Sequence, residues 1–304
     1  MPTLAPGIHY FDLTFRHRPR AIAGVLLHGA GEALLLDPGP SSTLPMVRET
    51  LAEAGLSIAE LTGILVTHIH LDHAGAVGTL VRENPRLRVY VHEAGAPHMA
   101  DPAKLVASAT RLYGDLMDTL WGEVAPVPAA AMTTLRGGER LQVAGRALDV
   151  AYTPGHAVHH VSYFSPDTGI AFVGDTAGVM MVENGFVLPP TPPPDIDLAL
   201  WHGSLDTIAA WHPGTLFLTH FGPSTRCAAH LAEVRDHLEF VAALARRSLE
   251  QPGEDADRER WFVDELRREL RRRLNDDEAS RYETSARFDL NWRGLARYWR
   301  KRLA

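Results

Sequence analysis

The most constraining feature of this sequence is the segment LVTHIHLDHAG at residues 65–75. Within it, three histidines and one aspartate occur in six residues, directly after an apolar run. The run predicts a buried strand, and α/β sheets usually place their sites at the carboxyl ends of strands. Imidazole and carboxylate are preferred ligands of zinc and related divalent metals. We therefore interpret His68, His70, Asp72 and His73 as the first half of a metal site, which other segments must complete.

Three further strand ends carry residues of the same chemical types. His156 follows a predicted strand at 147–152, Asp175 follows one at 170–173, and His220 follows one at 215–218. A strand-rich core would bring these loops to a common edge. Either histidine alone would more often be an ordinary surface or core residue, but seven ligand-type residues at four strand ends predict a metal site.

The order of predicted elements indicates a sheet with helices packed on it. A hairpin-like region at 8–37 is followed by alternating helices and strands, and the chain is helical from about residue 225 onward. We place a domain boundary there, with one domain at 1–225 that carries the predicted metal site and a helical extension at 226–304. The predicted elements are helices at 44–54, 75–83, 197–211, 228–249, 257–274 and 290–303, and strands at 61–66, 88–92, 141–143, 147–152, 162–164, 170–173 and 215–218.

A helical insertion is expected at about residues 97–125. Apolar residues recur at helical spacing over 103–122, which predicts an amphipathic helix or a broken pair of helices. Such a stripe more often packs on the core. In the alternative interpretation it covers the site and contributes Tyr113, Met117 or Trp121 to a substrate pocket.

Charge and composition exclude several classes of protein. With a net charge of -7, the chain as a whole lacks the excess of basic residues that is typical of nucleic-acid-binding proteins. The arginines of 267–273 alternate with acidic residues, which is typical of a solvated, ion-paired helix face. A single cysteine, Cys227, excludes a disulfide within the chain. With no signal-like segment and no apolar run of membrane-spanning length, we expect a cytoplasmic protein without a membrane partner.

These motifs together resemble the metallo-β-lactamase superfamily over about residues 8–225. The HxHxDH box spans 68–73, TPGH spans 153–156, a Gly-Asp pair lies at 174–175, and His220 follows a threonine. Asp37 matches the aspartate of an early turn in that family. The resemblance implies an α+β fold, the four-layer αβ/βα sandwich with two sheets face to face, helices outside and metals at one edge. The C-terminal helical extension lies outside the resemblance.

The resemblance also implies the ligands of two divalent metal ions. The expected metals are zinc, or alternatively manganese or iron. Asp72 and Asp175 would be the catalytic residues, with Asp37 and His160 supporting the ligands from behind. The implied ligands are His68, His70 and His156 for one ion, Asp72, His73 and His220 for the other, and Asp175 as the bridge.

Within the superfamily, the sequence is similar to the glyoxalase II-like and lactonase-like hydrolases. His160, four residues after His156, is typical of that branch, whereas an aspartate at 175 argues against antibiotic hydrolysis and His70 against diiron redox chemistry. The implied reaction is attack of a hydroxide shared by two metals on an ester-like bond of a small molecule. Tyr113 or Tyr163 would stabilise the oxyanion. A mononuclear-iron persulfide dioxygenase and a non-catalytic metal-binding interaction protein are the alternatives, and a homodimer is left open.

Overall fold

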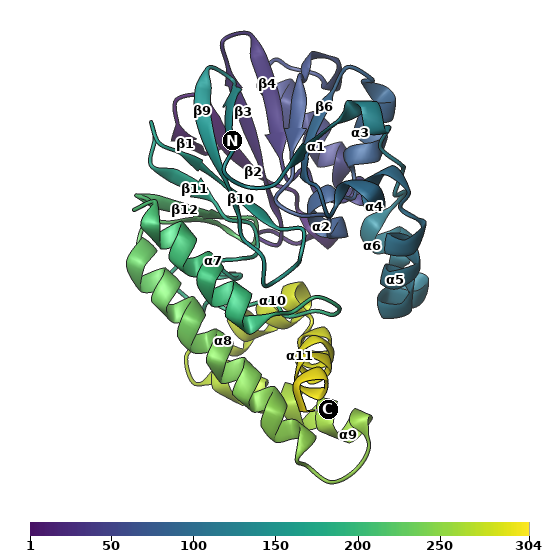
Figure 1. Cartoon of the computed structure of the whole chain (residues 1–304), viewed down its shortest axis with the longest axis vertical. Coiled ribbons are helices and arrows are strands. Elements are labelled where there is room, and N and C mark those ends of the chain that lie inside the picture. Colours follow the sequence, from purple (N-terminus) through teal and green to yellow (C-terminus); the bar gives the residue numbers. More distant parts are fainter. Residues whose placement is uncertain (304) are drawn as a thin grey trace.

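The fold has two β-sheets packed face to face, with helices on the outer face of each (Figure 1). The structure is a computed structural model that describes residues 1–303, with the backbone alone at residues 284 and 285. Three hydrophobic clusters fill the spaces between the layers. One lies between the sheets, and one lies beneath the helices on each side. The α+β four-layer sandwich expected from the sequence is therefore confirmed.

The first sheet has seven strands in chain order. Its first four strands are antiparallel, and from β4 to β7 they run parallel. The strands are β1 (Thr3–Ala5), β2 (Ile8–Asp12), β3 (Ala23–Gly29), β4 (Glu32–Leu36), β5 (Gly63–Leu65), β6 (Arg88–His92) and β7 (Met132–Leu135).

The second sheet has six strands in the order β13-β12-β11-β10-β9-β8. Only the pair formed by β11 and β12 is parallel. The strands are β8 (Arg140–Val143), β9 (Arg146–Tyr152), β10 (Val161–Ser165), β11 (Ile170–Phe172), β12 (Thr215–Leu218) and β13 (Gly222–Ser224).

Central strands of the first sheet are apolar on both faces because each face is covered. In β4, Leu34 and Leu36 join the cluster between the sheets, and Leu35 points to the helices on the other side. Side chains alternate along a strand, so an unbroken apolar run is the pattern that a doubly covered strand requires.

The helices fall into an outer layer on each sheet, an insertion and the C-terminal extension. None of the helices within residues 1–303 is long and apolar enough to cross a bilayer. Their bounds are α1 (Leu44–Glu53), α2 (Leu71–Ala74), α3 (Val77–Glu83), α4 (Ala96–Ala100), α5 (Ala103–Tyr113), α6 (Met117–Trp121), α7 (Leu198–Ala210), α8 (Cys227–Leu249), α9 (Asp255–Arg271), α10 (Asp276–Ala286) and α11 (Phe288–Leu303).

The predicted insertion at 97–125 is helical but broken. It contains most of α4, then α5 and α6, with a short 3-10 turn between the last two. The sequence left open whether residues 103–122 form one amphipathic helix or a broken pair of helices, and the structure has the broken pair.

The C-terminal helices share one hydrophobic cluster with the second sheet. Phe262 of α9 and Trp292 of α11 belong to the same cluster as Trp201 of α7. The expected boundary after residue 225 therefore divides residues that pack together, and the division into two domains stays a prediction. The basic run is ion-paired as expected: Arg272 lies 2.9 Å from Glu269, and Arg267 lies 3.0 Å from Asp264.

Helix α10 was not predicted, although the sequence contains its start signal. Asn275 caps the helix by accepting from the Glu278 N–H, and the Glu278 side chain reaches back to the Asn275 N–H. This capping box marks a helix start. The segment that follows has little apolar periodicity, so periodicity alone does not find it.

The shared cluster generates a stability prediction. Leu266 of α9 is fully buried, and Leu266→Ala should lower the free energy of unfolding by about 2–5 kcal/mol because it leaves a cavity. The matched control is Leu200→Ala on α7, where the side chain is 49% exposed and the expected change is within about 0.5 kcal/mol. Urea unfolding measures both. A similar small loss in both variants would show that α9 does not belong to the core.

Candidate metal centre

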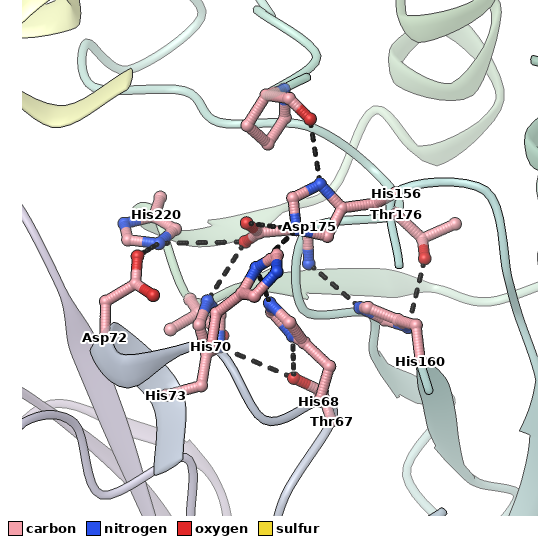
Figure 2. Close-up of polar contacts among 12 residues, drawn as sticks. Thr67, His68, His70, Asp72, His73, His156, His160, Asp175, Thr176 and His220 are labelled. Atoms are coloured by element: carbon pink, nitrogen blue, oxygen red, sulfur yellow. Dashed lines mark hydrogen bonds and ion pairs between the residues drawn. The ribbon is translucent and has the colours of Figure 1, made fainter. Parts of the chain in front are cut away.

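All seven predicted ligands lie together at one edge of the sandwich (Figure 2). The box follows β5 of the first sheet and runs into α2, and the other ligands follow β9, β11 and β12 of the second sheet. Strands β9 and β11 each pair antiparallel with β10, so they point the same way, and β12 is parallel to β11. The carboxyl ends of these three strands therefore reach one edge.

The ligand atoms form groups of the size that a metal ion requires. Within each group, every ligand atom lies within 4.8 Å of the others. His70 Nδ1 is 3.0 Å from both His68 Nε2 and His156 Nε2. The groups are His68, His70 and His156; Asp72, His73 and His220; and His68, His73 and Asp175.

Asp175 lies between the two three-residue groups proposed from the sequence. Its Oδ1 is 3.3 Å from His73 Nε2, and its Oδ2 is 3.4 Å from His156 Nε2. One carboxylate therefore offers an oxygen to each group, which is the arrangement a bridging ligand needs.

Two of these atoms are buried without a hydrogen bond. His73 Nε2 and Asp175 Oδ1 have no hydrogen-bond partner among the described residues, although buried polar atoms are nearly always paired. A cation between them would satisfy both. The nitrogen and oxygen donors without a thiolate suit a divalent metal, so the residues present fit the group that the sequence implied.

Three ligand histidines are oriented by the ring nitrogen that faces away from the centre. His73 Nδ1 lies 2.8 Å from Asp37 Oδ2, His156 Nδ1 lies 2.8 Å from the Pro190 oxygen, and His220 Nδ1 lies 2.7 Å from the Ala21 oxygen. Each acceptor holds the proton on Nδ1, which leaves the Nε2 lone pair directed at the centre.

Asp37 is fully buried and accepts from both sides of the sandwich. Its carboxylate accepts from the Thr67 N–H and hydroxyl at 2.8 Å each, and from the Thr219 hydroxyl at 2.9 Å. Thr67 follows a strand of the first sheet and Thr219 a strand of the second. Asp37 thus supports the site from behind.

His160 binds the backbone of Asp175. The Asp175 N–H donates to His160 Nε2 at 3.2 Å, and His160 Nδ1 lies 2.9 Å from the Thr153 hydroxyl. Gly174 has a φ of +48°, and a Cβ there would come within 2.6 Å of His160 Nε2. Only glycine therefore allows the chain to pass this close to the histidine.

The two groups differ in their electrostatic environment. Burial lowers the pKa of His68 well below its usual range, and burial together with His156 lowers the pKa of His70 to about 3. Burial alone would lower the pKa of His73, but the carboxylates of Asp175 and Asp37 raise it well above its usual value. The first group thus presents neutral imidazoles, the form that binds metals, and the second favours positive charge.

A pocket that is partly open to solvent lies over the centre. Its floor includes His70, Asp72, His156, Asp175 and His220. The insertion and the C-terminal extension form most of its walls. The wall residues are Leu105, Ser108, Ala109, Leu112, Tyr113 and Trp121 from the insertion, Ala286, Arg287, Leu290 and Asn291 from the extension, and Leu71, Val179, Pro190 and Pro192 from other segments.

Two of the four residues predicted for the pocket lie elsewhere. Tyr163 is fully buried between the sheets, and its hydroxyl donates to the Val66 oxygen at 2.8 Å, so the prediction that it contacts substrate is corrected. Met117 packs against the apolar cluster formed by Leu71, Ala109, Leu120 and Trp121. Helical spacing found the insertion but did not show which of its side chains face the cavity.

Several residues of the site were missed from the sequence. Thr67 and Thr219 bind Asp37, and each directly precedes a ligand histidine. This repeated Thr-His pair was a usable signal. The backbone oxygens of Ala21 and Pro190 leave none, because any residue type carries a carbonyl.

A two-sheet sandwich with histidines and aspartates clustered at one edge is the kind of protein that can bind divalent metals. The sequence model of the metallo-beta-lactamase superfamily matches residues 18–220. The chain belongs to this superfamily. It is 31% identical over 220 residues to a metallo-beta-lactamase fold-containing protein of Sulfurisphaera tokodaii, covering 71% of this chain and 78% of the relative.

Other relatives match a shorter part. A hydroxyacylglutathione hydrolase of Synechococcus sp. is 30% identical over 151 residues, which is 50% of this chain and 47% of that protein. A crystal structure of a metallo-beta-lactamase family protein from Thermus thermophilus has a TM-score of 0.74 at 24% identity, covering 99% of this chain and 96% of that chain. The match to that structure includes the C-terminal helices and concerns the fold alone.

The Asp37 network generates a prediction about metal affinity. Asn tolerates the positive φ of 48° at this position, but Asp37→Asn removes the charge and places an amide where His73 now donates. A metal ion at the group formed by Asp72, His73 and His220 should then bind about 10- to 100-fold more weakly. Titration against a chromogenic chelator measures this affinity.

Asp149→Asn is the matched control, because Asp149 pairs with Arg140 at the protein surface and should leave metal binding unchanged. Equal affinities in Asp37→Asn and Asp149→Asn would contradict the orienting role of Asp37.

Proposed function

We propose that the chain is a metal-dependent hydrolase that acts on an ester-like bond, a thioester or lactone, of a small molecule. The observation that carries the proposal is the position of Asp175 between two complete three-residue groups at the floor of a pocket. Two groups with a shared carboxylate suit a pair of divalent ions, with zinc as the expected metal. The hydroxyacylglutathione hydrolases among the relatives support a hydrolytic reaction.

Two divalent ions bound here would supply a water molecule of lowered pKa and a Lewis acid for the substrate oxygen. Asp72 lines the pocket and is ready to accept a hydrogen bond. Burial raises its pKa, but His73 and His220 lower it to about 2, so the carboxylate stays ionised near neutral pH. Asp72 would therefore orient a water molecule toward the substrate rather than hold a proton.

We infer that Tyr113 donates a hydrogen bond to the substrate. It ends α5, lines the pocket, and packs edge-on against Trp121 with 5.0 Å between ring centroids. Burial and the nearby Asp72 raise the pKa of Tyr113, so its hydroxyl stays protonated and can donate a hydrogen bond. A neutral donor in the pocket wall would stabilise negative charge that develops on a carbonyl oxygen.

Elemental analysis combined with a substrate panel tests the reaction class. We expect two zinc-like ions per chain and turnover of a thioester or lactone in a panel that also contains phosphodiesters. Asp175→Ala should abolish turnover, and the control Asp206→Ala, on an exposed pair with Arg235, should not.

The alternatives give other results. One iron per chain with oxygen consumption on a persulfide would replace the proposal with a dioxygenase. Bound metal without turnover on any ester, thioester or lactone would indicate a metal-binding interaction protein. Full turnover by Asp175→Ala would refute the proposed centre.

The donor role of Tyr113 has a test of its own. Tyr113→Phe should lower kcat/KM by about tenfold or more, since hydrogen bonds to charged groups contribute about 1.5–3 kcal/mol. Metal content should not change. Tyr163→Phe, which removes a hydroxyl buried between the sheets, should keep kcat/KM while losing about 1 kcal/mol of stability. Equal kcat/KM in both variants would remove Tyr113 from the mechanism.

A further inference from the structure

A loop at residues 188–194 connects the metal centre to the C-terminal helix α11. On the side of the metal centre, the Pro190 oxygen lies 2.8 Å from His156 Nδ1. The next residue, Thr191, is fully buried and faces α11. Its N–H donates to Asn291 Oδ1 at 2.8 Å, and its hydroxyl donates to the Asn291 oxygen at 3.2 Å. Because Thr191 follows Pro190 directly, the bonds to α11 also set the position of the Pro190 oxygen.

A glycine on α11 makes this close approach possible. A Cβ at Gly294 would lie 2.0 Å from the Thr191 oxygen and 2.8 Å from the Pro192 carbonyl carbon. Both contacts are with backbone, which cannot move aside as a flexible side chain does. Glycine in the interior of a helix destabilises that helix. The close packing of the loop against α11 explains why a glycine is present at position 294.

Helix α11 is itself fixed to the rest of the fold. Trp292 Nε1 donates to the Ser248 hydroxyl at 2.7 Å, and Trp299 Nε1 donates to the Ala242 oxygen at 2.8 Å. Both acceptors belong to α8. The loop therefore rests on a helix that is held independently of the metal centre.

We propose that α11 sets the metal affinity of the group formed by His68, His70 and His156, acting on His156 through the loop. Asn291 and Gly294 are then positioning residues. The inference rests on the metal centre of the proposed function and not on its substrate. Both residues lie beyond residues 18–220, so the part of the chain outside the family match would control a ligand inside it.

The physical basis is the acceptor for one ring proton. While the Pro190 oxygen accepts from Nδ1, the His156 ring keeps one tautomer and one orientation, with Nε2 toward the centre. If the loop moves away, the ring loses both constraints. The second group does not depend on this contact, because Asp37 orients His73 and the Ala21 oxygen orients His220. The effect should therefore fall on one of two ions.

Two helical Gly-to-Ala substitutions separate the proposal from a general effect. Gly294→Ala pushes the loop away from α11, whereas a Cβ at Gly203 of α7 would meet no atom within 4 Å. The metal-free full-length variants are titrated with zinc ions in competition with a chromogenic chelator. In Gly294→Ala, one ion should bind about 10- to 100-fold more weakly and the other as in the wild type. Gly203→Ala should match the wild type for both ions.

Asn291→Ala provides a second, milder variant in case Gly294→Ala does not fold. It removes the acceptor of the Thr191 N–H without adding an atom, and it should weaken the same ion. Thermal unfolding of the metal-free variants, followed by circular dichroism, reports stability separately. A merely structural role would lower the Tm and weaken both ions alike.

The outcomes distinguish this inference from the proposed function. Wild-type affinity for both ions in Asn291→Ala and in folded Gly294→Ala overturns the inference, as does an equal loss at both ions. A wild-type protein that binds fewer than two zinc ions also overturns it. A wild-type protein that binds two zinc ions but turns over no ester-like substrate refutes the hydrolase and leaves the role of α11 intact.

Discussion

The buried carboxylate of Asp37 is the interaction on which both the sandwich and the centre depend. An ionised group removed from water is costly unless hydrogen bonds and charge compensate it. Asp37 receives its donors from Thr67 after the first sheet, from Thr219 after the second, and from His73. The two sheets must therefore be in register at this edge before the charge is satisfied, and the same register brings the ligands together.

The two groups of ligand residues differ in the hydrogen-bond acceptors that bind the outer ring nitrogens of their histidines. His73 is backed by a carboxylate, whereas His156 and His220 are backed by backbone oxygens. Negative charge consequently gathers around one group, which contains Asp72 and lies next to Asp37, while the other group consists of three neutral imidazoles. Softer nitrogen ligands on one side and mixed nitrogen and oxygen ligands on the other favour different metals. The two subsites are therefore expected to differ in affinity and in metal preference.

The sequence predicted the ligands better than their supports, for a physical reason. Metal binding needs particular side chains at strand ends, so His68 and His220 stand out in the chain. A backbone oxygen such as that of Pro190 performs its role without any side-chain requirement. Tyr163 was wrongly assigned to the pocket because every residue of β10 is buried. No alternation of polarity therefore shows which face of the sheet each side chain takes. Apolar runs predicted a sheet with helices packed on it, whereas the two facing sheets and the four layers followed only from the family resemblance.

Ligands and pocket walls come from different parts of the chain, and this separates chemistry from specificity. The floor is built at strand ends that lie within the family match, whereas part of the wall comes from the extension. Arg287 illustrates the consequence. Its guanidinium lies over the Tyr113 ring at 5.8 Å and pairs with Asp289 at 2.6 Å, so it joins the extension to the insertion while its charge is largely compensated. A mostly apolar wall with one ion-paired cation would suit the apolar part of a bound small molecule.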